Sequence, residues 1–140
     1  MIMKKVLTVG ILMVLMVACG PSEEDMATDK LYSQLMEGHD EVMPKSMLLP
    51  KMKTKMLAMV ADLSETDSLK TVALDLSSDL TKANEDMYTW MAEFAVAMNN
   101  IEDKSEKLKR YTTLNEEIAA IGEATNSVME KAKTFLEENE

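Results

Sequence analysis

The 140-residue chain carries 15 basic and 25 acidic residues, which gives it a formal net charge of −10 at pH 7. This charge argues against nucleic-acid binding through phosphate contacts, and an anionic lipid surface would repel the chain. The single cysteine excludes an intramolecular disulfide bond. With 4 glycines, 3 prolines and 4% aromatic residues, and with Ala, Leu, Met, Glu and Lys abundant, the composition predicts one helical domain.

The first 19 residues, MIMKKVLTVGILMVLMVAC, have the pattern of a secretory signal. Lys4 and Lys5 precede an apolar run over residues 6–18, which ends on the small residue Ala18. The run is too short to span a bilayer, which needs roughly 20 apolar residues. We therefore expect residues 1–18 to be a signal peptide that is removed.

Cys19 stands directly after this run, and the end of the signal resembles the lipobox of bacterial lipoproteins. In those proteins the cysteine is acylated and becomes the mature N-terminus. The resemblance implies that Cys19 is the lipidation site, carrying chains such as palmitate, and that it holds the protein at a membrane of the cell envelope. Val17 and Ala18 fit the lipobox, whereas Met16 stands where leucine is usual. The alternative is an ordinary signal peptide followed by an incidental cysteine.

Residues 19–28 are expected to form a lipidated acidic tether, because this stretch has little apolar surface to bury. Its acidic run SEED, residues 22–25, resembles the export signal of surface-exposed Bacteroidota lipoproteins. That resemblance implies an outer-membrane location, on the periplasmic face or on the cell surface. The alternative is that the run is only a solvated linker.

A first helix is predicted to begin at Thr28 or Asp29, either of which can act as its N-cap. Pro44 and Pro50 interrupt the helix, and we expect a kink or break near each of them. One apolar stripe follows the helix at intervals of seven residues. This stripe consists of Leu35, Val42, Leu49, Met56 and Leu63, with Leu31, Met52, Met59 and Val60 beside it.

Two further helices are predicted over residues 67–98 and 103–138, after a turn at residues 64–67. Apolar residues recur in both at alternating spacings of three and four, which is the pattern of a helical-bundle seam. The first of these seams consists of Leu69, Ala73, Leu76, Leu80, Ala83, Met87, Trp90, Phe94 and Ala97. The second consists of Tyr111, Leu114, Ile118, Ile121, Thr125, Val128, Ala132 and Phe135. Gly122 costs the last helix about 1 kcal/mol relative to alanine, and a close helix crossing would account for it.

Three long helices with short connections are expected to pack antiparallel. The predicted fold is therefore an all-α, up-down-up three-helix bundle over residues 29–140. The alternative is an extended coiled-coil hairpin that dimerises. In the bundle, one level of aromatic residues and the face around His39 would lie in the half nearer the anchor. These aromatic residues are Tyr32, Tyr88, Trp90, Phe94 and Tyr111.

One segment suggests a site: residues 39–45, HDEVMPK, which contain the only histidine, His39. Met36, His39 and Met43 share a helix face, because spacings of three and four return to the same side. A hairpin turn near residue 65 would place His39 at the level of Ala92. The residues of the second helix that this face would approach are Met87, Tyr88, Trp90 and Met91.

Imidazole and thioether groups suit Cu(I), and an indole ring can cap a cation. The sequence therefore offers a soft-metal site with Cu(I) as the expected ion. Its candidate ligands are His39, Met36, Met43, Met87 and Met91, with Trp90 beside them. A more general binding face would consist of His39, Asp40, Met43, Tyr88 and Trp90. The simpler interpretation is that the methionines fill an irregular core. A hard cation is a poorer match, because adjacent carboxylates on a helix point about 100° apart.

The order of these motifs resembles that of small Bacteroidota lipoproteins that carry the automatic name "viral A-type inclusion protein". The matching segments are residues 39–45, residues 87–91 (MYTWM) and residues 121–126 (IGEATN). The chain departs from the pattern at Ser46, where methionine is expected, although Met47 follows. The resemblance implies a lipid-anchored helical protein and brings no activity with it.

Neither a phosphate-binding glycine loop nor a Gly-x-Ser-x-Gly turn is present, and the carboxylates alternate with lysines as on a solvated helix face. The sequence therefore predicts that the protein is not an enzyme. It predicts a protein-interaction or structural module that a lipid holds at the membrane, with another envelope protein as partner and no nucleic acid. Soft-metal binding is the alternative function.

Overall fold

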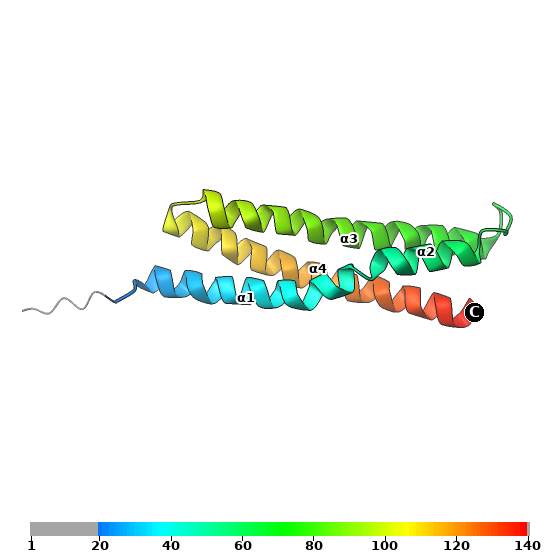
Figure 1. Ribbon diagram of the computed structural model, residues 1–140, viewed down its shortest axis with the longest axis horizontal. Helices are drawn as coiled ribbons and strands as arrows, with labels where there is room; N and C mark the ends of the chain where they lie inside the picture. Colours follow the sequence, from blue (N-terminus) through cyan, green and yellow to red (C-terminus); the bar gives the residue numbers. More distant parts are fainter. Residues whose placement is uncertain (1–19, 140) are drawn as a thin grey trace, which may run out of the picture.

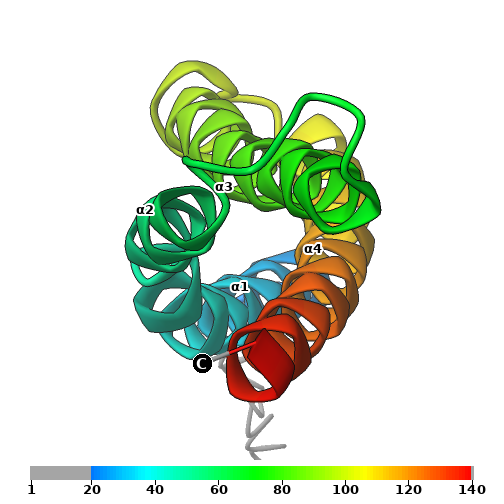
Figure 2. The same cartoon turned by 90° about the vertical axis from the view of Figure 1, so that its right-hand side faces the viewer.

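The computed structural model describes residues 20–139, and this part of the chain is all-helical. The helices are α1 (Glu23–Ser46), α2 (Leu49–Met59), α3 (Ser68–Asn100) and α4 (Lys104–Asn139). They form three long legs, since α2 continues the course of α1, and the legs alternate in direction (Figure 1). Viewed along the bundle, the three legs lie at the corners of a triangle (Figure 2). The expected helical bundle is thus confirmed, with four helices in three legs.

The predicted signal peptide, residues 1–18, and Cys19 lie outside the described residues. Within residues 20–139, no helix is both long enough and apolar enough to cross a membrane.

α1 begins at Glu23, so the predicted start at Thr28 or Asp29 is wrong by about a turn and a half. Ser22 caps the helix: its Oγ accepts a hydrogen bond from the backbone N–H of Asp25, whose carboxylate accepts one from the N–H of Ser22. This reciprocal pair satisfies two helix-end donors. Acidic side chains in the first turn are also favoured by the helix dipole. Of the tether expected over residues 19–28, the described part that precedes α1 is therefore only residues 20–22.

An ion pair ties the start of α1 to the start of α4. Nζ of Lys104 lies 2.7 Å from Oδ1 of Asp25. The Lys104 ammonium and the hydroxyl of Ser22 lower the pKa of Asp25 from 3.8 to about 2, and the carboxylate in turn raises the pKa of Lys104. The first turn of α1 is therefore part of the bundle.

The first leg is interrupted once, at Met47 and Leu48, between the two prolines. Pro44 lies inside α1, and Pro50 occupies the first turn of α2, where a missing N–H costs nothing. Backbone bonds bridge the break, because the Leu48 N–H donates to the carbonyl of Lys45 and the Leu48 carbonyl accepts from α2. The sequence predicts a kink or break near each proline, and the structure has one break, which lies between them.

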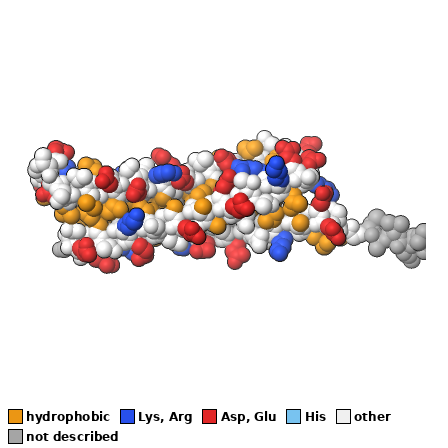
Figure 3. Space-filling model, turned by 180° about the vertical axis from the view of Figure 1, so that it is seen from behind, with side chains coloured by type: hydrophobic (Ala, Val, Ile, Leu, Met, Phe, Trp, Pro, Cys, Tyr) orange, Lys and Arg blue, Asp and Glu red, His pale blue; other side chains and the backbone are white. Residues whose placement is uncertain are grey.

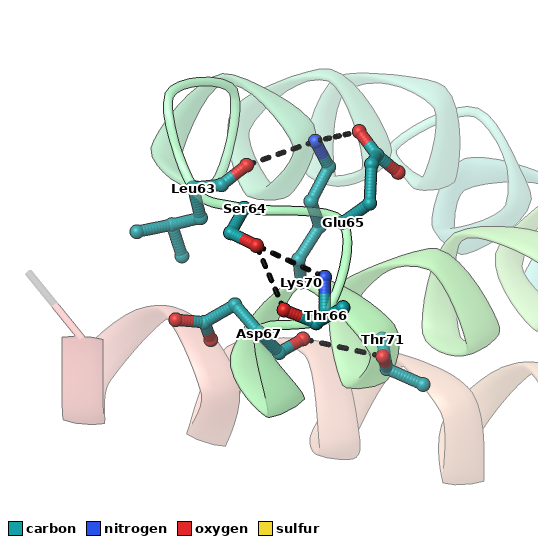
Figure 4. Close-up of polar contacts among 7 residues, drawn as sticks. All are labelled: Leu63, Ser64, Glu65, Thr66, Asp67, Lys70 and Thr71. Carbon is teal, nitrogen blue, oxygen red and sulfur yellow. Dashed lines mark hydrogen bonds and ion pairs between the residues drawn. The ribbon is translucent and has the colours of Figure 1, made fainter.

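The turn between α2 and α3 lies where the sequence places it, and side chains close it (Figure 4). The carboxylate of Asp67 caps α3 by accepting a 2.8 Å hydrogen bond from the N–H of Leu69. Lys70 reaches back across the turn, donating to the carbonyl of Leu63 at 3.1 Å and pairing with Glu65 (Figure 4). The predicted start of this helix at residue 67 is confirmed.

Buried side chains form two hydrophobic cores along the bundle. The proximal core, near residue 20, consists of Leu35, Val42, Met87, Trp90, Phe94, Ala97, Tyr111, Leu114 and Ile118. The distal core consists of Leu49, Met56, Val60, Ala73, Leu80, Ala83, Val128, Met129, Ala132, Phe135 and Leu136. Most of these residues belong to the predicted seams. Between the cores, Oγ of the fully buried Ser46 donates to Oδ1 of Asn84 at 3.0 Å.

Two glycines let α1 and α4 approach closely. A Cβ added at Gly122 would lie 3.1 Å from Cγ2 of Val42, which confirms the close crossing predicted there. A Cβ at Gly38 would lie 2.9 Å from Cγ2 of Ile118. α1 consequently packs mainly on α4, and it touches α3 only lightly.

Candidate functional site

The region around His39 is the site that the sequence singles out, and it lies in the seam between α1 and α3. The His39 and Trp90 rings stack with their centroids 6.5 Å apart and their planes 26° apart. The structure thus sets His39 opposite Trp90, two residues from the expected level of Ala92. The two legs touch lightly here, so side chains rather than close backbones fill this seam.

Aromatic rings continue the seam toward residue 20. Phe94 packs against Trp90, Tyr32 and Tyr111, with ring centroids 5.3 Å, 5.9 Å and 5.8 Å away, respectively. The expected aromatic level therefore forms, with one exception. Tyr88 is 49% exposed and lies outside this group of ring contacts among the described residues. The prediction that Tyr88 shares the face with His39 is therefore not supported by the geometry.

One polar group of this cluster is already engaged by the fold. The indole N–H of Trp90 donates a buried 2.8 Å hydrogen bond to the carbonyl of Leu114 on α4. Burial also raises the pKa of Tyr111, so its phenol stays neutral over the physiological range. Trp90 can therefore offer a bound cation only its ring face.

The candidate methionines divide into buried and half-buried ones. Met87 is fully buried in the proximal core. Met36, Met43 and Met91 are half-buried and pack against the same core. Met87 therefore serves as core packing, whereas the other three lie at the edge of the proximal core and are partly exposed to solvent.

His39 itself is held by its neighbour on α1. Its Nδ1 lies 2.9 Å from Oδ1 of Asp40, and its side chain is 28% exposed. Among residues 20–139, no three His, Cys, Asp or Glu side chains gather in a group that could hold a metal ion.

Two of the surface hollows, neither of them anticipated from the sequence, bear on binding. A cavity of about 390 Å³ lies between α1 and α4 and has an apolar floor that includes Val42 and Ile118. Its polar rim consists of Gln34, Glu37, Glu41, Asn115, Glu123 and Asn126. The glycines at positions 38 and 122, which leave this groove without side chains, were the signal that could have revealed it.

The second hollow, of about 260 Å³, lies on α3 near the turn into α4. Ala92, Val96 and Ile101 contribute to its mainly apolar lining, and Glu93 and Arg110 form an ion pair there. Val96 is 55% exposed. We call this hollow the α3 pocket.

The far side of the bundle carries both charged and apolar side chains. Figure 3 shows the bundle from behind, with acidic and basic side chains along both edges of the face. Between them, an apolar stripe runs along the half of the bundle far from residue 20 (Figure 3).

Comparison with known proteins identifies no relative, since no family model, no curated protein and no solved structure matches the chain.

Proposed function

We propose that this protein is a lipid-anchored helical bundle of the cell envelope that acts as a non-enzymatic protein-interaction module. The signal-like pattern of residues 1–18 and the position of Cys19 support the anchor. The resemblance to Bacteroidota lipoproteins supports a location at the outer membrane.

The bundle would sit close to the membrane. Helix α1 begins four residues after Cys19, and four residues span at most about 14 Å. The ion pair between Asp25 and Lys104 fixes the first turn of α1 to α4. The half of the bundle that contains the aromatic seam would therefore face the membrane side, and residues 60–67 would point away from it.

The observation that carries the interaction role is the α3 pocket. It is apolar at its centre, has an ion pair beside its half-exposed Val96, and lies on the outside of the bundle rather than in its core. Concave apolar patches with polar rims are typical of surfaces that bind other proteins. The partner that this surface fits is an envelope protein with an apolar side chain that enters the pocket.

Replacing Cys19 by serine tests the anchor. The unchanged protein should fractionate with the membrane and incorporate labelled acyl chains. The Cys19→Ser protein should incorporate no acyl label, and it should either keep its signal peptide or appear in the soluble fraction. Acyl labelling of the Cys19→Ser chain would overturn the lipidation proposal.

A matched pair of substitutions tests the interaction surface. Val96→Glu puts a charge into the α3 pocket, and Leu74→Glu puts the same charge on a similarly exposed position of α3 in the distal half. Each protein is immobilised and incubated with detergent extract of the envelope, and captured proteins are identified by mass spectrometry. We expect a partner that Leu74→Glu retains and Val96→Glu loses. Capture that is unaffected by Val96→Glu would exclude the pocket.

A further inference from the structure

The seam between α1 and α3 places thioethers on both sides of a histidine. Met36 precedes His39 by three residues on α1, and Met43 follows it by four, so each lies one helical turn away. Side chains at these spacings have Cβ atoms about 5–6 Å apart, a distance that flexible methionine side chains can close. Across the seam, Met91 directly follows Trp90, on which the His39 ring stacks.

The histidine is arranged as a metal-binding imidazole usually is. Metal-bound histidines typically donate the N–H of one ring nitrogen to a carboxylate, which orients the ring and leaves the other nitrogen as the ligand. Nδ1 of His39 lies 2.9 Å from the carboxylate of Asp40. Nε2 has no hydrogen-bond partner among the described residues, so its lone pair is available when Nδ1 carries the proton.

The surroundings select the class of ion. Thioether sulfurs are soft ligands and imidazole suits copper, so three half-buried methionines with one histidine favour Cu(I) over oxygen-seeking cations. The nearest carboxylate, that of Asp40, is engaged with Nδ1 of His39. The face of Trp90 adds a cation–π contact on the interior side, because its N–H is committed to Leu114.

We propose that this seam binds one Cu(I) ion through Nε2 of His39 and the sulfurs of Met43 and Met91, with Met36 as a further sulfur ligand. Trp90 closes the site from the interior, and Asp40 orients the histidine. This inference is independent of the interaction role of the α3 pocket, which lies on another surface of the bundle.

Cu(I) titration of the full chain tests the site. The chain carries Cys19→Ser, because a free thiol would itself bind Cu(I). Ascorbate keeps the copper reduced, a chromophoric chelator competes for it, and the fluorescence of Trp90, the only tryptophan, is recorded. We expect one tightly bound ion with a Kd below about 1 μM and quenching that follows its uptake. Weaker binding, or binding that leaves the fluorescence unchanged, would overturn the proposal.

Substitutions locate the ion. His39→Ala and the pair Met43→Leu with Met91→Leu should each weaken binding by about tenfold or more, and Asp40→Ala should also weaken it by roughly tenfold. The control pair, Met52→Leu with Met59→Leu, changes two half-buried methionines beside the distal core and should leave affinity unchanged.

Leucine conserves the volume of methionine, so the leucine pairs should keep the fold, which circular dichroism checks. Equal losses in the seam pair and the control pair would show that binding depends on methionine content and not on this seam. Full affinity in His39→Ala would exclude the site.

Discussion

Replacing Gly38 by alanine should destabilise the bundle, although alanine is the better helix former. The new Cβ would lie 2.9 Å from Cγ2 and 3.1 Å from Cγ1 of Ile118 on α4. Ile118 is only 2% exposed, and as a β-branched residue in a helix it has one strongly preferred rotamer. Neither side of the contact can therefore move away without shifting a helix.

The magnitude follows from two opposing terms. Alanine in place of glycine favours the helix by about 1 kcal/mol. Overpacking a well-filled core costs about 1–3 kcal/mol, and a contact this short lies in the middle of that range. We therefore expect Gly38→Ala to lower the free energy of unfolding by about 1 kcal/mol, which lowers Tm by roughly 4 °C for a domain of this size.

A double-mutant cycle separates the two terms. Ile118→Ala alone should cost about 2–5 kcal/mol through the cavity that it leaves. In that background the short contact no longer exists, so adding Gly38→Ala should stabilise the protein by up to about 1 kcal/mol. The sign of the glycine substitution thus reverses between the two backgrounds, with a coupling energy of about 2 kcal/mol.

Urea unfolding followed by far-UV circular dichroism measures all four proteins. Gly122→Ala is the matched comparison, because its Cβ would meet a single atom of Val42 at 3.1 Å and the effect should lie nearer zero. Stabilisation by Gly38→Ala of the same size in both backgrounds would refute the close approach of α1 and α4 at this position.

Three further outcomes are expected. The ion pair between Asp25 and Lys104 should release the start of α1 as the pH falls from about 4 to about 2. The stabilisation that comes with the lowered pKa of Asp25 is complete above its ordinary value of 3.8 and is lost as the pH approaches about 2. Amide exchange in the first turn should show this release, and Asp25→Asn should abolish its pH dependence. Trp90→Phe should cost about 2 kcal/mol in urea unfolding, through lost volume and the lost bond to the Leu114 carbonyl, and an unchanged midpoint would contradict this. Thr125→Val should instead stabilise the protein by about 1 kcal/mol, because the buried hydroxyl has no hydrogen-bond partner among the described residues, and a lower midpoint would show that it has one.

Most of the helices and their apolar seams could be predicted from the sequence. The alternation that predicts the second and third helices depends only on local spacing, and Trp90 and Leu114 are buried where it expects them. The cap of α3 at Asp67 could also be predicted, because it depends only on neighbouring residues. The predicted start of α1 lies too late in the chain, because Ser22 and Asp25 of the acidic run form a capping box and do not belong to a solvated tether.

The candidate site was predicted in part. The spacing of Met36, His39 and Met43 showed that they share a face, and the hairpin placed that face near Trp90. The seam spacing already places Met87 in the core, which leaves it no role at the surface. The hairpin level alone could not show that Tyr88 is exposed to solvent, because the rotation of the helix about its axis decides this. The α3 pocket had no signal in the sequence, because it forms where side chains from α3, α4 and the turn between them meet.

By itself, the sequence determined the helical fold, the two long seams and the signal-like pattern before Cys19, because helix periodicity and the charge pattern of a signal are local properties of the chain. Only the tertiary structure decided which stripe of α1 faces which neighbour. Gly38 and Gly122 draw α1 onto α4 along the Leu35 and Val42 stripe, and this leaves the His39 stripe over Trp90. That choice depends on how side chains on different helices interlock, and no spacing within a single helix encodes it.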